Sequence, residues 1–324
     1  MSGQPDQPDL SVVIPTMNKV ELLRQTLEAV LEQDPGPGRS FEVVVVDDGS
    51  TDGTAAFLAS RPEEGRLRPV TPGKNVGRAR ARNFGAQQAR GQWILFLDDD
   101  IIAPPGLLKA HLDLLEAHPG AGTIGYAVTD PDLIDAPHFH YLDTRGVARL
   151  DPGPAPGRYF VTQNAAVPRA AFQRIGGFDE GFSGYGFEDM EVAFRLEDQA
   201  GVHFFALTAP VPRHVHHHTS AQYFDKKREC GRQSLRHIAR LHPRRIPEMQ
   251  LHHVIDHEGQ VAPGLTGRAI RFLAGTTLGR DLPRWLEKWP VGDRNFPLLA
   301  PLYYRLMSLA VLLSFRQGVT DRQD

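Results

Sequence analysis

The stretch QWILFLDDDII, residues 92–102, joins five consecutive apolar residues to three consecutive aspartates. A continuous apolar run bounded by polar residues is typical of a strand that is covered on both faces of a parallel sheet. Adjacent carboxylates at a strand end repel each other and lose hydration, and a divalent cation would relieve both costs. Asp98, Asp99 and Asp100 therefore predict either a cation site at the carboxyl edge of a sheet or a solvated acidic turn that caps the next helix.

The composition is that of an ordinary soluble globular protein, with 41% hydrophobic and 23% charged residues among 324. The net charge of −3 gives no general case for nucleic acid as a partner. Cys230 is the only cysteine, which excludes an intrachain disulfide and fits a reducing compartment. The polar residues 1–9 read as a frayed tail rather than a signal peptide, so the expected location is cytoplasmic.

Strands alternate with helices in the first half of the chain. Apolar strands are predicted at residues 10–14 and 41–46, and helical patterns follow at 21–33 and after residue 54. This order favours a right-handed parallel α/β sheet. The helix predicted at 75–90 carries four arginines, which could face a pyrophosphate at the sheet edge or form a solvated basic face.

Further strands are predicted at 123–128, 160–167 and 202–206, and residues 130–158 form a long, irregular connection rich in Pro, Gly and Asp. Glu188 and Asp189 follow a glycine-aromatic loop and open a helix, where a carboxylate can also act simply as a cap. His214 and His216 belong to a histidine cluster that is either a source of metal ligands or a polar strand end.

Acids at two strand ends, a separate carboxylate pair and a histidine cluster together indicate an anionic ligand held through a divalent metal, with one carboxylate left for proton chemistry. A nucleotide diphosphate is the natural anion. The sequence has neither a GxxxxGK[ST] phosphate loop nor a GxGxxG after its first strand, which disfavours P-loop and dinucleotide readings.

Five motifs in the right order resemble family 2 glycosyltransferases of the GT-A fold. They are SVVIPTMN at 11–18, VDDGSTDGT at 46–54, NVG with ARN at 75–83, FLDDD at 96–100, and GGFDE with GFED at 176–189, the last being similar to the acceptor motif of galactosyltransferase and chondroitin-polymerase-like members. The resemblance covers about residues 10–220 and implies a Rossmann-like, mostly parallel sheet flanked by helices.

The resemblance also implies roles for individual residues. Asp189 would be the general base, with Glu188 beside it at the acceptor or donor sugar. The donor-binding residues would be Pro15, Thr16, Asn18, Asp48 at the base, Lys74, Arg82, Asp98 at the ribose or sugar, and Asp99. Asp100 would ligate Mn²⁺ or Mg²⁺ together with His214 or His216. The donor would be a nucleotide-diphosphate sugar, most often a UDP-sugar, and the acceptor a hydroxyl of a glycan or a lipid-linked sugar.

The Glu188-Asp189 pair favours inversion, because retaining relatives carry Glu-Asn at this place. An inverting transfer needs a base on the face of the sugar opposite the leaving group. Two rival functions stay open. A sugar nucleotidyltransferase would need a glycine-rich basic loop after the first strand, which residues 15–23 do not supply. A non-catalytic nucleotide-sugar or glycan-binding module would have no use for the acids and histidines together.

The expected domains are a tail at 1–9, a GT-A domain at 10–222 and a helical extension at 223–324. Amphipathic helices are predicted at 225–242 and 265–289. Residues 297–315 are more apolar, but Pro301 and Arg305 interrupt them, which favours a buried core helix over a membrane span. The other possibility is a helix lying on the inner face of an anionic membrane, which would suit a lipid-linked acceptor. The oligomeric state is left open.

Overall fold

Two compact units make up the chain in the computed structural model, which describes residues 7–61, 65–133, 136–182, 184–216, 218–256, 264–289 and 296–321. The sheet unit comprises Met1–Leu133, Asp143–Glu180 and Val192–His216. The helical unit comprises Ile134–Leu142, Gly181–Glu191 and His217–Asp324. The chain therefore passes between the units several times before the C-terminal helices begin.

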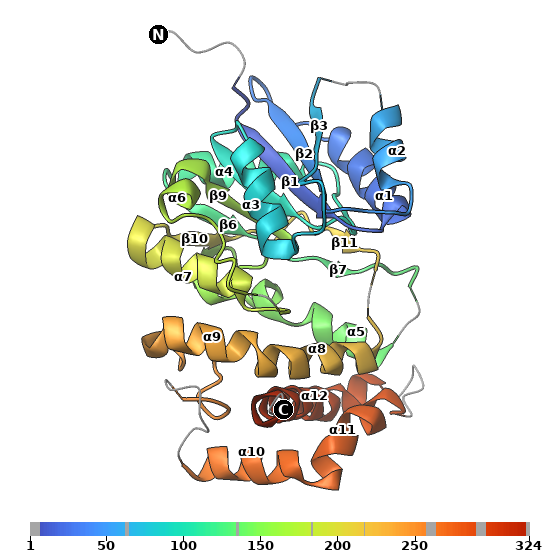
Figure 1. Ribbon diagram of the computed structural model, residues 1–324, viewed down its shortest axis with the longest axis vertical. Helices are drawn as coiled ribbons and strands as arrows, with labels where there is room; N and C mark the ends of the chain where they lie inside the picture. The colour runs from blue at the N-terminus through green and yellow to red at the C-terminus, as the bar shows by residue number, and fades with distance from the viewer. Residues whose placement is uncertain are drawn as a thin grey trace. The chain divides into compact units, whose positions relative to one another are not determined.

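An eight-stranded sheet in the order β3-β2-β1-β4-β9-β6-β10-β8 forms the centre of the sheet unit (Figure 1). Its strands are β1 (Leu10–Thr16), β2 (Phe41–Asp47), β3 (Leu67–Val70), β4 (Trp93–Leu97), β6 (Gly122–Ile124), β8 (Gly153–Ala155), β9 (Asn164–Pro168) and β10 (Phe204–Ala206). Strands β3, β2, β1 and β4 are parallel, whereas β9 runs antiparallel to both β4 and β6. This mostly parallel sheet with flanking helices confirms the predicted GT-A architecture.

Successive side chains of the strands belong alternately to two separate hydrophobic clusters, one on each face of the sheet. Val12 and Leu95 pack with α1 (Val20–Leu31), α2 (Thr54–Ser60) and α4 (Leu107–Ala117). Val13 and Phe96 pack with α3 (Arg78–Gln88), α6 (Arg169–Arg174) and α7 (Glu188–Ala200). The period-two alternation means that both faces of the sheet are buried, as the continuous apolar runs predict.

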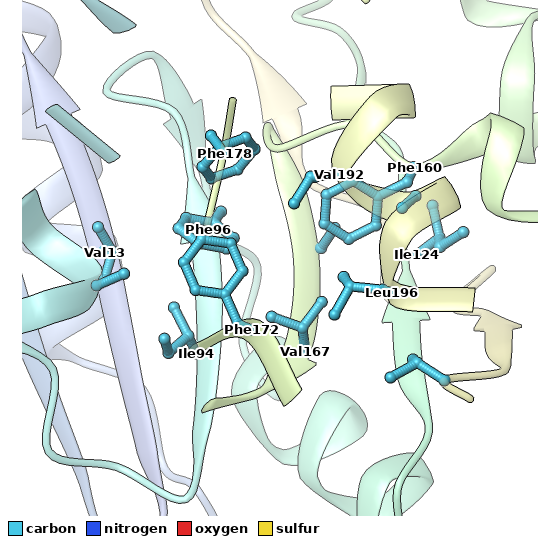
Figure 2. Close-up of a cluster of buried hydrophobic side chains, with 14 of the residues drawn as sticks. Val13, Ile94, Phe96, Ile124, Phe160, Val167, Phe172, Phe178, Val192 and Leu196 are labelled. Atoms are coloured by element: carbon cyan, nitrogen blue, oxygen red, sulfur yellow. The ribbon is translucent and has the colours of Figure 1, made fainter. Parts of the chain in front are cut away.

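Aromatic rings attach the glycine-rich segment after α6 to the sheet. The Phe96 ring lies 5.3 Å from that of Phe172 and 5.2 Å from that of Phe178, measured between centroids (Figure 2). Asn83 on α3 accepts from the Phe178 amide at 2.8 Å and donates to the Phe178 carbonyl at 2.9 Å. These contacts fix the start of the GGFDE motif against the helix that carries Arg82.

A second, three-stranded sheet brings the acidic triplet near the histidines. It consists of β5 (Ile101–Ile102), β11 (Arg213–His214) and β7 (Val128–Thr129), in that order. His214 pairs with Ile101 in antiparallel register, directly after Asp100. Backbone pairing therefore sets the distance between the two predicted metal-site residues.

Several sequence expectations differ from the structure. The strand expected at 123–128 is divided between β6 and β7, which belong to different sheets. The strand expected at 160–167 begins only at Asn164, after a 3₁₀ turn at Gly157–Tyr159. The connection 130–158 is not irregular throughout, since it contains α5 (Pro137–Asp143), a 3₁₀ turn at Gly146–Arg149 and β8. These short elements have no amphipathic period long enough to read from sequence.

The helical unit is built from α8 (Ser220–Arg232), α9 (Ser234–Leu241), α10 (Leu265–Gly275), α11 (Thr277–Glu287) and α12 (Phe296–Thr320), so the single helix expected at 225–242 is two. Tyr303, Met307, Ala310 and Leu313 of α12 are buried, in agreement with a core helix. Residues Leu298–Thr320 are also long and apolar enough to cross a bilayer, although 33% of the tested window is already buried. Length and composition alone are weak support for a span.

Candidate active site

The candidate site lies where three neighbouring parallel strands end. Strands β2, β1 and β4 lie side by side, and their carboxyl ends lead into Asp48, the loop Thr16–Lys19 and Asp98–Asp100, respectively. Thr16 pairs with Asp47 in register, so the two loops start at the same level of the sheet. Ligands of open α/β sheets bind at this edge.

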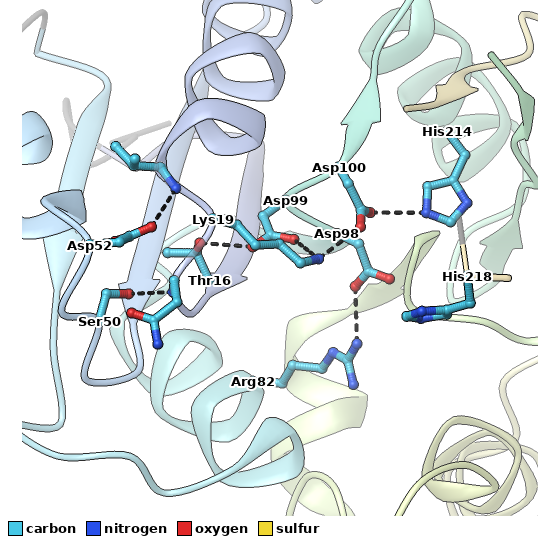
Figure 3. A network of polar contacts seen from close by, with 12 residues as sticks. Thr16, Lys19, Ser50, Asp52, Arg82, Asp98, Asp99, Asp100, His214 and His218 are labelled. Atoms are coloured by element: carbon cyan, nitrogen blue, oxygen red, sulfur yellow. Dashed lines mark hydrogen bonds and ion pairs between the residues drawn. The ribbon is translucent and has the colours of Figure 1, made fainter. Parts of the chain in front are cut away.

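The acidic triplet divides into two differently paired parts (Figure 3). The Asp98 carboxylate forms an ion pair with Arg82 of α3 at 3.0 Å. The Asp99 carboxylate accepts a hydrogen bond from Thr16 Oγ1 at 2.8 Å. The Lys19 ammonium lies 2.8 Å from an oxygen of Asp99 and 2.8 Å from an oxygen of Asp100. Asp99 and Asp100 are therefore buried and paired, and Asp98 is paired and about one-third exposed, which is not the pattern of a fully solvated turn.

Lys19 and the two carboxylates perturb one another's protonation. Burial alone would lower the pKa of Lys19, but the charges of Asp99 and Asp100 outweigh it and raise that pKa. Burial raises the pKa of Asp99 to about 6, against the lowering effect of Lys19. The pKa of Asp100 falls below its usual range, because hydrogen bonding and charge from His214 and Lys19 exceed its own burial cost. Asp100 is thus the carboxylate held most firmly in its ionised form.

The structure brings His214 to the acidic triplet. Its Nε2 lies 3.2 Å from Asp100 Oδ1, on the side of the carboxylate away from Lys19 (Figure 3). His216 lies two residues beyond the end of β11, and pairing with β5 does not extend to it. Between the two candidate histidines, the geometry favours His214.

The donor set beside Asp100 fits a divalent ion. A carboxylate and an imidazole suit Mn²⁺, and Mg²⁺ is often held by one or two carboxylates plus substrate phosphates. Within the described residues, no group of three His, Cys, Asp or Glu side chains could hold a metal ion. Asp100 and His214 would supply two ligands, and a diphosphate and water could supply the others.

Asp48 shapes the loop next to the acidic triplet. It is 5% exposed, and its two oxygens accept from the backbone N–H groups of Val76 at 2.7 Å and Gly77 at 3.0 Å. Gly49 follows in the left-handed region at φ 80°, and a Cβ there would lie 2.8 Å from the Asn75 nitrogen. The DDG sequence is thus needed for close approach of two loops, and contact of Asp48 with a base remains a prediction.

The other predicted donor residues surround these loops. Asn18 has a left-handed backbone at φ 54°. Its side-chain oxygen accepts a hydrogen bond from the backbone N–H of Thr51 at 2.7 Å, and its backbone N–H donates to Ser50 Oγ at 2.9 Å. Pro15 is half-buried near the end of β1, and Lys74 is exposed on the loop that Asp48 anchors. The Arg82 side chain is only 6% exposed and forms an ion pair with Asp98, and its contact with phosphate remains a prediction.

Lys19 is a residue of the candidate site that the sequence does not single out. It appears in the sequence only as part of a loop after the first strand. Its position could have indicated a contact with the acidic triplet, because a cation three residues past the end of one strand can reach acids at the end of the adjacent parallel strand. The register of β1 with β4, in which Val13 pairs with Phe96, supplies that adjacency and cannot be read from either motif alone.

Glu188 and Asp189 are the first two residues of α7, as expected, and the preceding Phe187 has a left-handed backbone at φ 72°. Both acids belong to the helical unit, whereas Asp98–Asp100 belong to the sheet unit. The structure therefore supports their place at a helix N-terminus, and their role as base and sugar ligand remains a prediction.

The fold and the acidic strand edge define a glycosyltransferase of GT-A architecture. Residues 11–176 match Glycosyl transferase family 2, and the chain belongs to this family. Residues 153–220 also match the N-terminal domain of galactosyltransferase, which agrees with the resemblance of the GGFDE and GFED motifs.

Relatives and solved structures give the same class. A validoxylamine A glucosyltransferase from Streptomyces hygroscopicus subsp. limoneus is 35% identical over 58% of this chain and 48% of its own length. An N-acetylglucosaminyl-diphospho-decaprenol L-rhamnosyltransferase from Mycobacterium tuberculosis is 28% identical over 56% and 69%, respectively. The chain thus spans about half the length of the validoxylamine relative that it matches.

Two solved structures share the fold over nearly the whole chain. The mannosyltransferase PcManGT from Pyrobaculum calidifontis, in complex with GDP-Man and Mn²⁺, superposes with a TM-score of 0.62 at 21% identity, covering 97% of this chain and 88% of its own. TarS residues 1–349 from S. aureus, in complex with UDP, gives 0.55 at 18% identity, covering 96% and 90%. At these identities the likeness establishes the fold alone.

Proposed function

We propose that this glycosyltransferase is metal-dependent and inverting, and that it transfers a sugar from a UDP-linked donor to a hydroxyl of a glycan or lipid-linked acceptor. The observation that supports the proposal best is the buried Asp100 carboxylate, which lies between the Lys19 ammonium at 2.8 Å and the His214 imidazole at 3.2 Å. A charged carboxylate and an imidazole at the carboxyl edge of a parallel sheet are suited to hold a cation against a diphosphate.

In this proposal the loops at the strand ends bind the donor. Asp48 would receive the base, and Asp98 the ribose or sugar. The surrounding donor-binding residues would be Pro15, Thr16, Asn18, Lys74, Arg82 and Asp99. Thr16 and Asp99 are already hydrogen-bonded to each other, and Arg82 is held by Asp98, so these side chains are preorganised before a ligand arrives.

Asp100 and His214 would hold Mn²⁺ or Mg²⁺. When bound, the ion would offset the negative charge that grows on the departing diphosphate. Asp189 would accept the proton of the acceptor hydroxyl while its oxygen attacks the anomeric carbon, with Glu188 orienting the sugar beside it. The place of Asp189 in the first turn of α7 favours its ionised form, which a general base needs.

We also propose a GT-A domain at 10–222 and a helical extension at 223–324. The protein would be cytoplasmic and would lie at the inner face of a membrane. The two solved structures with this fold contain different nucleotides, GDP-Man in PcManGT and UDP in TarS. The donor test must therefore compare uridine and guanosine nucleotides directly.

The first experiment is a hydrolysis and transfer assay with a panel of UDP-sugars and GDP-sugars, each with Mn²⁺ and with chelator. We expect turnover with a UDP-sugar and loss of turnover on chelation. Activity with GDP-sugars alone would contradict the donor assignment, and full activity in chelator would contradict the metal requirement. Absence of hydrolysis or transfer with every donor would favour the non-catalytic binding module.

The second experiment separates the base from the metal ligand. Asp189→Asn should lower turnover on the order of a thousandfold, because a positioned base is lost, while UDP affinity by calorimetry stays nearly unchanged. Asp100→Ala should weaken UDP binding in Mn²⁺. The matched control is Asp198→Asn in the exposed last turn of the same helix, which should leave both quantities alone. Equal loss of UDP affinity in Asp189→Asn and Asp100→Ala would show that Asp189 is not a dedicated base.

A further inference from the structure

Large apolar side chains are exposed along one side of α10 and of α11. On α10, Leu265 is 84% and Phe272 is 72% exposed, and on α11, Leu278 is 72% and Trp285 is 51% exposed. The members of each pair are seven residues apart, which is two helical turns, so each pair lies on one helix face. Two consecutive helices thus each present a two-residue apolar ridge to solvent.

These ridges are separate from the faces with which the same helices pack. Ile270 and Ala274 of α10 are buried with Leu313 of α12, and Leu286 of α11 is buried with Tyr303 and Met307. Each helix therefore already has a core-facing side. The exposed ridges are an additional apolar surface, and such surfaces on soluble proteins mark interaction sites.

Basic side chains accompany the ridges. Residues 264–289 contain five basic residues and two acidic ones, a local charge of +3 in a chain whose net charge is −3. The basic residues are Arg268, Arg271, Arg280, Arg284 and Lys288, all of them exposed. An interleaved apolar and cationic surface is complementary to an apolar interior under a layer of anions.

An open hollow along the C-terminal half of α10 has the chemistry of an anion site. It has a volume of about 460 Å³ and is lined by Arg268, Arg271, Phe272, Gly275 and Thr276. Two guanidinium groups offer forked donors that match phosphate oxygens, and the phenyl ring supplies an apolar floor beside them. A phosphate with an attached hydrocarbon would satisfy both parts of the hollow.

We propose that the α10–α11 surface binds an anionic phospholipid bilayer, with Phe272 and Trp285 inserted at the level of the headgroups and Arg268 and Arg271 on lipid phosphate. A bilayer fits better than a protein partner, because cations share the ridge faces: Arg268 is three residues after Leu265 and four before Phe272, and Lys288 is three residues after Trp285. Asp281 is an exposed acid between Leu278 and Trp285 on the α11 face. The proposed contact surface is α10–α11. Leu298 and Leu302 at the start of α12 are also exposed, whereas Met307, Ala310 and Leu313 of the same helix are buried in the core.

Membrane binding through α10–α11 rests on the proposed location at a membrane. It can be tested without the transfer reaction, so that the membrane proposal and the proposed activity can fail separately. The full chain is sedimented with vesicles of phosphatidylcholine containing about one-third phosphatidylglycerol, and with phosphatidylcholine alone. We expect binding to the anionic vesicles only, weakening as salt is raised. Equal binding to both vesicle types, or to neither, would overturn the proposal.

Matched variants locate the surface. Arg268→Gln with Arg271→Gln should lower vesicle affinity about tenfold or more, since two basic residues are lost from the contact. Arg232→Gln with Arg240→Gln removes the same charge from exposed positions of α8 and α9 and should leave affinity within about twofold. Equal loss in both pairs would show a general charge effect and would overturn the assignment to α10–α11.

The apolar part has its own readout. Trp285 fluorescence should shift to shorter wavelength on addition of anionic vesicles, and Trp285→Phe should lose that shift while circular dichroism stays unchanged. Phe272→Ser should weaken vesicle binding without forming or dissolving a dimer in ultracentrifugation. A concentration-dependent dimer that Phe272→Ser dissolves would mean that a second copy of the chain covers the surface, and the bilayer assignment would then be wrong.

Discussion

The Lys19 ammonium bridges two buried carboxylates at the place proposed for a divalent ion. It lies 2.8 Å from oxygens of both Asp99 and Asp100, so it neutralises their repulsion without any metal. A divalent ion on Asp100 would have this cation as a neighbour, and the two would repel each other. The free site should therefore bind metal weakly, and the negative charge of a nucleotide diphosphate should strengthen that binding.

Substitution of Lys19 tests this competition. Lys19→Met keeps the length of the side chain and removes its charge, so we expect Mn²⁺ in the absence of nucleotide to bind about tenfold more tightly or better, which is about 1.4 kcal/mol. Electron paramagnetic resonance of free Mn²⁺ measures this directly. The control Lys109→Met removes a lysine that is paired with Asp113 on an exposed helix face. Unchanged or weaker Mn²⁺ binding in Lys19→Met would contradict the competition.

His111 is a buried group that ties three elements of the sheet unit together. Its Nδ1 lies 2.7 Å from Thr123 Oγ1 on β6, and its Nε2 lies 2.8 Å from Asn164 Oδ1 on β9. Because the amide oxygen accepts, Nε2 carries the proton and the neutral imidazole accepts from the threonine. Burial lowers the pKa of His111 to about 4, partly opposed by the bond to Asn164.

The lowered pKa of His111 predicts a pH dependence of stability. Between about pH 6.5 and pH 4 the His111 imidazole is protonated in the unfolded chain and neutral in the folded chain. This contribution is fully present above pH 6.5 and is lost as the pH falls, by about 3 kcal/mol in the free energy of unfolding. Urea unfolding at several pH values should show a shallower dependence in His111→Gln than in the wild type. The half-buried His118→Gln serves as control, and parallel curves for wild type and His111→Gln would refute the assignment.

At the scale of elements, α3 approaches the sheet through a glycine. A Cβ on Gly85 would lie 2.5 Å from Val13 Cγ1 and 2.7 Å from Val46 Cγ2, and β-branched side chains in a strand have little freedom to move. The same helix carries Arg82 and Asn83 one turn earlier. The spacing between α3 and the sheet therefore also positions part of the donor site.

Two glycine substitutions of opposite sign test this packing. Gly85→Ala should destabilise the protein by about 1–3 kcal/mol through overpacking, despite the better helix propensity of alanine. It should also weaken UDP binding as α3 moves. Gly275→Ala at the end of α10, where a Cβ meets nothing within 4 Å, should be neutral or stabilising by about 0.5–1 kcal/mol. Chemical unfolding measures both, and equal effects would show that the approach of α3 to the sheet is not tight.

The strands β1, β2 and β4 and the helices α1 and α4 could be predicted from sequence because each has a clear period, whereas β3 and β5 were not predicted. The apolar runs that form β1, β2 and β4 are buried on both faces, and α1 and α4 have one apolar stripe each. The unpredicted β3 and β5 have four and two residues, and every strand after residue 120 has two to five residues, as in β7, β9 and β11. Elements this short owe their conformation to their neighbours in the sheet, so their period carries little information.

The positions of the acids in the candidate site could be predicted from sequence, but the residues that pair with them could not. The position of Asp98–Asp100 after a buried strand marks the carboxyl edge of the sheet. The partners of these acids come from long-range register: Lys19 through the adjacency of β1 and β4, and His214 through its pairing with β5. Residues 80 or more apart in sequence meet here, and no local pattern records such contacts.

At the scale of the whole molecule, ligand binding should appear as added stability. UDP with Mn²⁺ at about 100 times its dissociation constant should stabilise the folded chain by about 2.7 kcal/mol, since only the folded state can assemble loops from three strands. For a unit of this size the calorimetric midpoint should rise by roughly 5–10 °C. GDP with Mn²⁺, and UDP with chelator, should each give a smaller rise. Asp100→Ala should abolish the metal-dependent part while retaining the fold, as judged by circular dichroism. An equal rise with GDP, or a rise that is indifferent to chelator in the wild type, would contradict the uridine preference or the metal requirement, respectively.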